Sequence, residues 1–94
     1  MITAPAFAGR RYGVFGLARS GRATVAALAA SGAEVWAWDD GAAARDAFAG
    51  PLTDLNSADL SGLAAIVVSP GVPHSAPIFA RAAAAGVPVV GDIA

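Results

Sequence analysis

The chain alternates short apolar runs with alanine-rich stretches, and this alternation predicts its secondary structure. The apolar runs are rich in valine and aromatic residues and end at glycine, proline or aspartate, which is typical of strands. The alanine-rich stretches carry apolar residues at helical spacing and are followed by glycine, which commonly ends a helix. Strands are therefore predicted near residues 12–15, 34–38, 65–69 and 87–90, helices over 20–31, 42–48 and 77–85, and a brief edge strand over 52–55.

Single residues mark the ends of two of these helices. Ser20 is the predicted N-cap of the first helix, because its hydroxyl could accept a hydrogen bond from a first-turn amide. Gly32 is the predicted end of that helix. Pro77 suits the first turn of the last helix, where a missing N–H costs nothing, and Gly86 is predicted to end it.

Strands that alternate with helices pair in parallel through right-handed crossovers. The predicted fold class is therefore α/β, a Rossmann-like three-layer α/β/α sandwich with a parallel sheet of four or five strands in the order 3-2-1-4-5. Pro88 places the last strand at an edge of the sheet. A chain of 94 residues has room for one core, so residues 1–94 are expected to form a single domain.

Composition excludes several classes of protein. The chain has no cysteine, which rules out thiol catalysis, disulfides and cysteine-ligated zinc. It has no lysine and a net charge of −1, which argues against a nucleic-acid surface and rules out a Walker-type phosphate loop. No apolar run reaches the roughly 18 to 20 residues of a membrane span, so we expect a cytoplasmic protein that does not bind membranes.

A glycine turn after the first predicted strand points to a phosphate ligand. Gly16-x-Ala18-x-x-Gly21 has the spacing of the G-x-G-x-x-G turn of nucleotide-binding βαβ units, with alanine in the middle position. Gly16 allows a sharp turn, Gly21 lets the helix lie close to the strand, and the unpaired amides of the first helical turn attract an anion. Ala18 indicates that this anion is approached differently from the pyrophosphate of a standard dinucleotide.

Two other loops are predicted to meet this turn. Residues 39–41, Asp-Asp-Gly, follow the second strand, and residues 69–71, Ser-Pro-Gly, follow the next long strand. Ligands of parallel sheets bind beyond the carboxyl ends of the strands, so the three loops together predict one nucleotide site. Arg19 is preferred to Arg22 as its cation. Two plainer interpretations stay open: the glycines could serve helix packing alone, and Asp39 could be a solvated turn residue.

The sequence offers no catalytic apparatus. It holds no carboxylate pair, no Ser/His/Asp set and no metal-ligand spacing. His74 is expected to be a surface or capping residue, and Trp36 and Trp38, which share one face of a strand, are expected to be core or helix-packing residues. We therefore predict a binding module with no catalytic residue and no metal site.

Four segments together resemble the N-terminal domain of the Mur ligases. They are residues 14–24, 38–40, 67–73 and 85–93, which occur in the right order and span nearly the whole chain. The combination of Ser-Pro-Gly-Val-Pro with Gly-Val-Pro-Val-Val-Gly-Asp-Ile is far more specific than the glycine turn. Among the Mur ligases, the chain is most similar to those that add D-glutamate to UDP-N-acetylmuramoyl-L-alanine.

The resemblance implies a place in a larger enzyme. Mur ligases are ATP-dependent, ADP-forming amide ligases of peptidoglycan synthesis with three domains. The N-terminal domain holds the UDP end of the substrate, the central domain is an ATPase, and the C-terminal domain admits the amino acid. By this likeness the chain is a fragment that binds UDP-N-acetylmuramoyl-L-alanine, has no activity or cofactor of its own, and leaves ATP and Mg²⁺ to the full-length enzyme.

The resemblance also implies roles for single residues. Residues 16–20 would face the diphosphate and uracil, with Arg19 and Ser20 at the phosphates. Asp39 and Asp40 would meet the uracil or the ribose, and Gly71 would lie beside the nucleotide. The chain departs from common family members at positions 18 and 41. The implied UDP-binding set is Gly16, Leu17, Ala18, Arg19, Ser20, Asp39, Asp40 and Gly71.

Two other functions are compatible with the sequence. The chain could be the first half of an NAD(P)-binding dehydrogenase domain, with Asp39 on the adenosine ribose. Ala18 and the Ser-Pro-Gly loop at residues 69–71 count against this alternative. The chain could also be an interaction domain of flavodoxin-like shape that binds no nucleotide.

Overall fold

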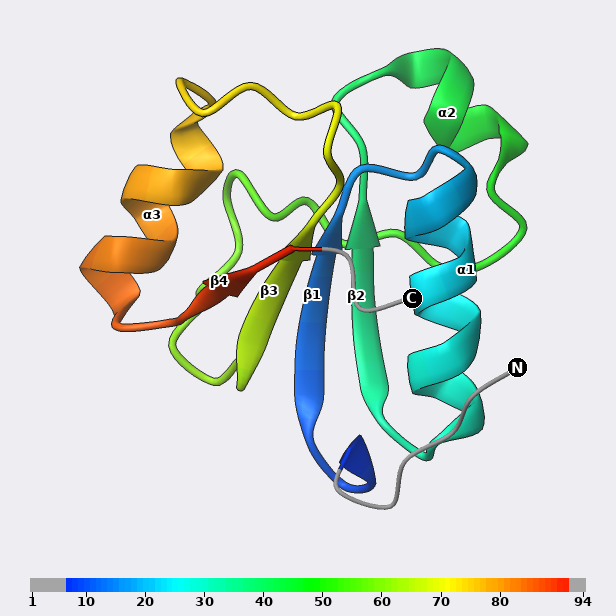
Figure 1. The fold of residues 1–94 in the computed structure, drawn as a ribbon, viewed down its shortest axis with the longest axis horizontal. Helices are drawn as coiled ribbons and strands as arrows, with labels where there is room; N and C mark the ends of the chain where they lie inside the picture. The colour runs from blue at the N-terminus through cyan, green and yellow to red at the C-terminus, as the bar shows by residue number, and fades with distance from the viewer. Residues whose placement is uncertain (1–6, 92–94) are drawn as a thin grey trace.

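The computed structural model describes residues 7–91, which form alternating strands and helices (Figure 1). Asp92 and Ile93, which belong to the last segment of the Mur ligase resemblance, lie outside the described residues. The elements are β1 (Arg11–Phe15), α1 (Arg19–Ala30), β2 (Glu34–Trp38), α2 (Ala42–Ala47), β3 (Ala65–Val68), α3 (Pro77–Ala85) and β4 (Val89–Val90).

The strands of this part of the chain form one parallel sheet in the order β2-β1-β3-β4. The predicted edge strand over residues 52–55 shortens to a single parallel bridge between Leu52 and Ala37 of β2. Pairing ends there because Asp54 turns the chain: its carboxylate and carbonyl accept the amides of Asn56 and Ala58 at 2.9 Å each. With Leu52 counted as the third strand, the predicted order 3-2-1-4-5 is confirmed.

Side chains alternate across the sheet and build a separate core on each face. Val14 and Ala37 face α1 and pack against Leu28, which is fully buried. Phe15 and Ile66 belong to the opposite core, which α3 and residues 53–63 cover. Figure 1 shows α1 and α3 on the two sides of the sheet, so the predicted three-layer sandwich is confirmed.

The helix ends agree with the sequence except at the start of α1. Gly32 and Gly86 have φ angles of 85° and 71°, the left-handed geometry that ends a helix. The N-cap of α1 is Ala18, without a side-chain hydrogen bond, so the prediction of Ser20 as N-cap is wrong. Because Ala18 is extended and its carbonyl already accepts the amide of Arg22 at 3.0 Å, Ser20 lies inside the first turn.

Within residues 7–91, none of the helices combines the length and the apolarity that crossing a bilayer requires.

Candidate functional site

The loop between β1 and α1 is shaped by the absence of two side chains. Gly16 has a φ of 104°, a conformation that other residues rarely adopt, and its amide donates to the carbonyl of Trp38 at 2.8 Å. A Cβ at Gly16 would lie 2.7 Å from Cβ of Ser69, and a Cβ at Gly21 would lie 1.8 Å from the carbonyl oxygen of Gly16. Both glycines therefore have the turn and close-approach roles that their spacing predicts.

Ser69 ties the glycine turn to the loop after β3. Its hydroxyl donates to the carbonyl of Gly16 at 3.1 Å, and its amide donates to the carbonyl of Phe15 at 3.0 Å. Residues 53 positions apart in the chain thus meet at the carboxyl end of the sheet. The sequence places Ser69 in this loop, but only the packed sheet shows that it holds the turn.

Asp39 joins the loop after β1 to the loop after β2. One carboxylate oxygen accepts the amide of Leu17, and the other accepts the amide of Gly41, each at 2.7 Å. Hydrogen bonds to a charged acceptor are stronger than those between neutral groups. Asp39 therefore fixes the geometry of both loops, a role that the sequence alone does not reveal.

An Asp39→Asn variant is expected to lower the free energy of unfolding by about 1 to 2 kcal/mol. Asparagine would present an NH₂ group to one of two converging amide donors. Urea denaturation measures the loss, and Asp46→Asn is the matched control because Asp46 is exposed and makes no polar contact among the described interactions. Equal unfolding free energies for the two variants would contradict the proposed role.

Asp40 is held from two sides at the end of β2. Its Oδ1 accepts the indole N–H of Trp38 at 3.1 Å and the side-chain amide of Asn56 at 2.7 Å. Sequence reasoning missed Asn56 because a polar residue in a loop gives no signal of a partner 16 positions away. The carboxylate of Asp40 is therefore oriented by the fold before any ligand arrives.

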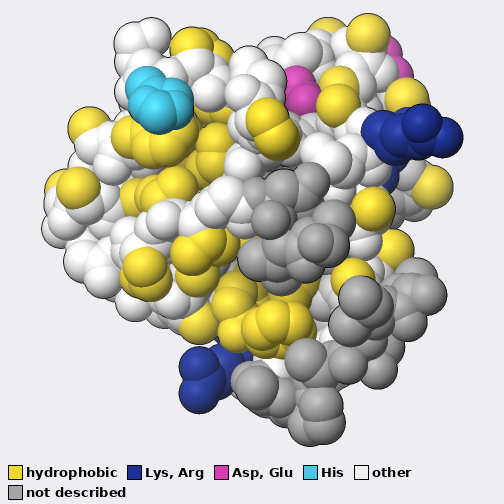
Figure 2. Space-filling view, viewed as in Figure 1, with side chains coloured by type: hydrophobic (Ala, Val, Ile, Leu, Met, Phe, Trp, Pro, Cys, Tyr) yellow, Lys and Arg dark blue, Asp and Glu magenta, His cyan; other side chains and the backbone are white. Residues whose placement is uncertain are grey.

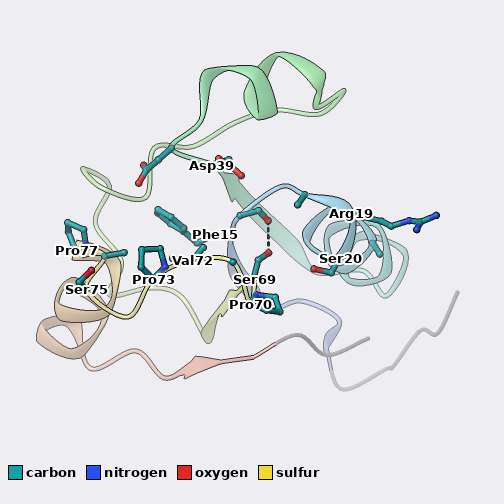
Figure 3. Close-up of a pocket in the computed structure, with 16 residues that line it drawn as sticks. Phe15, Arg19, Ser20, Asp39, Ser69, Pro70, Val72, Pro73, Ser75 and Pro77 are labelled. Atoms are coloured by element: carbon teal, nitrogen blue, oxygen red, sulfur yellow. Dashed lines mark hydrogen bonds between the residues drawn. The ribbon is translucent and has the colours of Figure 1, made fainter.

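A cavity of about 1140 Å³ opens where these loops meet (Figure 3). Its volume is slightly above the range of small-molecule sites, roughly 300–1,000 Å³. The predicted residues that line it are Gly16, Ala18, Arg19, Ser20, Asp39, Asp40 and Gly71. Ser69 and Pro70, from the loop that the sequence places at the site, also line it. The lining residues that the sequence did not assign to the site are Phe15, Ala23, Val72, Pro73, Ser75, Ala76 and Pro77.

The side chains of Leu17 and Arg19 do not point into the cavity, contrary to what the sequence indicates. The side chain of Leu17 is only 3% exposed and packs in the core under α1, so its amide, bound to Asp39, is what Leu17 contributes to the loop. Arg19 lines the cavity at its rim, but its side chain extends away from Phe15 and Ser69 (Figure 3). The guanidinium would have to rotate inward to meet an anion.

The cavity combines an apolar wall with two kinds of polar group. Val72 and Pro73 give it an apolar surface, above the buried ring of Phe15. The first-turn amides of α1 have no partner within the helix and carry the positive end of its dipole, which favours an anion. Asp39 and Asp40 line the cavity where β2 ends, and Figure 2 shows acidic side chains in the region of α2. The arrangement suits a ligand with a flat apolar part, hydrogen-bond donors and an anionic group.

Metal chemistry has no visible basis in the part of the chain that the structure describes. Within those residues, no group of three or more His, Cys, Asp or Glu side chains could hold a metal ion. His74 is exposed and stacks at a tilt on Phe79, with 5.6 Å between the ring centroids.

Comparisons with known proteins agree with this geometry. Residues 10–91 match the family model described as Mur ligase MurD-like, N-terminal domain. A UDP-N-acetylmuramoylalanine--D-glutamate ligase of Sphingopyxis alaskensis is 60% identical over 97 residues, which cover 99% of this chain and 22% of the relative. Ligases with the same name from Novosphingobium aromaticivorans and Zymomonas mobilis are 56% and 47% identical, each over 99% of this chain.

The chain spans 22% to 24% of the length of these three relatives. No solved structure matches it. The family match covers β1 to β4 and includes all three loops around the cavity. This chain therefore belongs to the family of MurD-like Mur ligase N-terminal domains.

Proposed function

We propose that this chain binds the UDP part of UDP-N-acetylmuramoyl-L-alanine for the ATP-dependent addition of D-glutamate in peptidoglycan synthesis. The observation that carries the proposal is the cavity that the glycine turn, the aspartates after β2 and the Ser-Pro-Gly loop at 69–71 line together. Membership of the MurD-like family supports it, as do relatives named for this ligase.

The diphosphate has a natural place at the start of α1. The amides of the first turn point outward without helical partners, and Ser20 adds a hydroxyl donor that lines the cavity. Gly71 leaves open space beside them, because a Cβ there would meet no atom within 4 Å. Arg19 completes the phosphate site by turning inward when the ligand is bound.

The uridine has a natural place at the end of β2. Asp40 lines the cavity with a carboxylate that Trp38 and Asn56 hold in place, and it can accept a hydrogen bond from the base or the ribose. Val72 and Pro73 offer apolar surface for the flat ring. Asp39 acts beside them mainly through the loops that it joins.

The chain supplies binding and leaves the chemistry to the rest of the enzyme. It has no lysine for a phosphate loop, and the described residues lack a metal-ligand group, so they do not fit an ATP and Mg²⁺ site. We assign ATP and Mg²⁺ to a central ATPase domain, and D-glutamate to a C-terminal domain, of the same cytoplasmic enzyme. The chain alone is then inactive as a ligase.

Titration of the 94-residue chain with four ligands tests the proposal. UDP and UDP-N-acetylmuramoyl-L-alanine are expected to shift the NMR signals of the amides of residues 16–21, while NAD and ATP leave them in place. Binding is expected to be weak, because one domain offers one wall of a cleft that the whole enzyme closes. An Arg22→Ala variant serves as the control in this titration and is expected to give the same shifts as the unmodified chain, since Arg22 is exposed on α1 and does not line the cavity.

The alternatives predict other outcomes. Shifts with NAD alone would favour a dehydrogenase domain, which the comparisons do not support. Absence of shifts with every nucleotide would favour an interaction domain.

A further inference from the structure

Helix α2 has little to hold it in place. It has six residues, none of them buried, and its N-cap, Gly41, offers no side-chain hydrogen bond. Isolated helices shorter than roughly 12 residues are marginal in water. Yet α2 directly follows Asp39 and Asp40, which line the cavity, so its position bears on the site.

One side chain of α2 ties the helix to the end of β2. The guanidinium of Arg45 lies over the ring of Trp38, 4.8 Å from the centroid, and its Nη1 donates to the carbonyl of Asp39 at 2.9 Å. Arg45 is partly buried. Its side chain contacts Asp39 and Trp38, which lie outside α2, and the described interactions include no such contact for another α2 side chain.

The partner of Arg45 is itself oriented. The indole N–H of Trp38 donates to Asp40 at 3.1 Å, so the ring that Arg45 covers is fixed by a lining residue of the cavity. A planar guanidinium can stack on an aromatic face and donate in its own plane, which the ammonium of lysine cannot do. The contact therefore depends on arginine itself and not on charge alone.

Asp39 links Arg45 to the glycine turn. Arg45 holds the carbonyl of Asp39, and the carboxylate of the same residue accepts the amides of Leu17 and Gly41. A shift of Asp39 would therefore move the loop that carries Gly16 and the start of α1. Arg45 also brings a positive charge to the carbonyl of Asp39 at the end of β2, where the carboxylates of Asp39 and Asp40 would repel a diphosphate.

We propose that Arg45 is a positioning residue for the cavity. It touches no ligand and does not line the cavity, but it keeps Asp39, Asp40 and the glycine turn in their binding geometry and offsets the acidic charge at the end of β2. This role rests on the proposed function, because the effect on affinity is defined for UDP.

Three variants of the 94-residue chain test this role. Arg45→Ala is expected to weaken UDP binding about tenfold, since it removes the stacking, the hydrogen bond and the charge together. Arg45→Lys keeps the charge and is expected to restore affinity in part, to about threefold below the unmodified chain. Arg22→Ala removes a charge from α1 and is expected to bind UDP like the unmodified chain.

A readout without ligand separates positioning from simple destabilisation. The NMR signals of the amides of Leu17 and Gly41 are expected to move in ligand-free Arg45→Ala and to stay in place in Arg22→Ala. Thermal denaturation of each variant confirms that the chain is folded at the temperature of the titration. If Arg45→Ala does not fold, the UDP titration and the ligand-free NMR measurement are made on Arg45→Lys.

Two outcomes would overturn the role of Arg45. One is a UDP affinity of Arg45→Ala equal to that of Arg22→Ala. The other is a Leu17 amide signal in ligand-free Arg45→Ala that coincides with the signal of the unmodified chain. Failure of the unmodified chain to bind UDP would instead refute the proposed function, and the ligand-free signals would still test the link from Arg45 to the turn.

Discussion

Replacing Gly21 with alanine is expected to abolish UDP binding and to lower the free energy of unfolding by roughly 3 kcal/mol or more. The added Cβ would lie 1.8 Å from the carbonyl oxygen of Gly16 and 2.8 Å from its carbonyl carbon. Both are backbone atoms, so no side-chain rotation relieves the overlap. Either α1 moves away from β1 or the turn opens, and both changes displace the first-turn amides that the phosphate would meet.

Urea denaturation and UDP titration of the folded variant measure the two effects of Gly21→Ala. Gly91→Ala is the matched control, because a Cβ at Gly91 would meet no atom within 4 Å and Gly91 does not line the cavity. The control is expected to keep both its stability and its affinity for UDP. A Gly21→Ala chain that binds UDP like the control would show that the phosphate does not depend on this turn.

Replacing Leu55 with alanine is expected to lower the free energy of unfolding by about 2 to 5 kcal/mol. Leu55 is fully buried although it lies outside every helix and strand. It packs in the core on the face that α3 covers, near enough to β1 for a Cβ at Gly13 to lie 3.4 Å from its Cδ1. The truncation would leave a cavity under the sheet.

Leu52→Ala is the matched control for Leu55→Ala, with the same change of side chain three positions away. Leu52 is 38% exposed and forms a single bridge to Ala37. Its truncation is therefore expected to lower the free energy of unfolding by no more than about 1 kcal/mol. Thermal or urea unfolding followed by circular dichroism measures both variants. Similar losses for the two would mean that residues 53–63 do not form a layer of the core.

The sequence alone predicted most of the fold because local signals agree along the chain. A short, continuous apolar run such as residues 65–68 is typical of a strand that is buried on both faces of a sheet. Gly32 and Gly86 end helices at positions where the backbone is left-handed. Parallel order then follows from the alternation of strands and helices. The convergence of the three loops follows as well, since all carboxyl ends lie at one edge of a parallel sheet.

Tertiary structure alone decided which polar atoms pair across that edge. The sequence indicates that Asp39 lies at the site, but its bonds to the amides of Leu17 and Gly41 exist only once β1 and β2 are packed. The same holds for Asn56 on Asp40. No periodicity encodes such contacts, because they depend on the distance between separate elements.

Packing made one prediction from local rules wrong and shortened a second element. A hydroxyl at position 20 favours an N-cap, but the close approach of Gly21 to Gly16 starts α1 at Arg19 and leaves Ser20 inside the helix. Residues 52–55 favour a strand, but Leu55 gains more by filling the core beneath the sheet than by pairing at its edge. Sequence determined the elements and their order, and packing determined where each begins and which side chains complete the cavity.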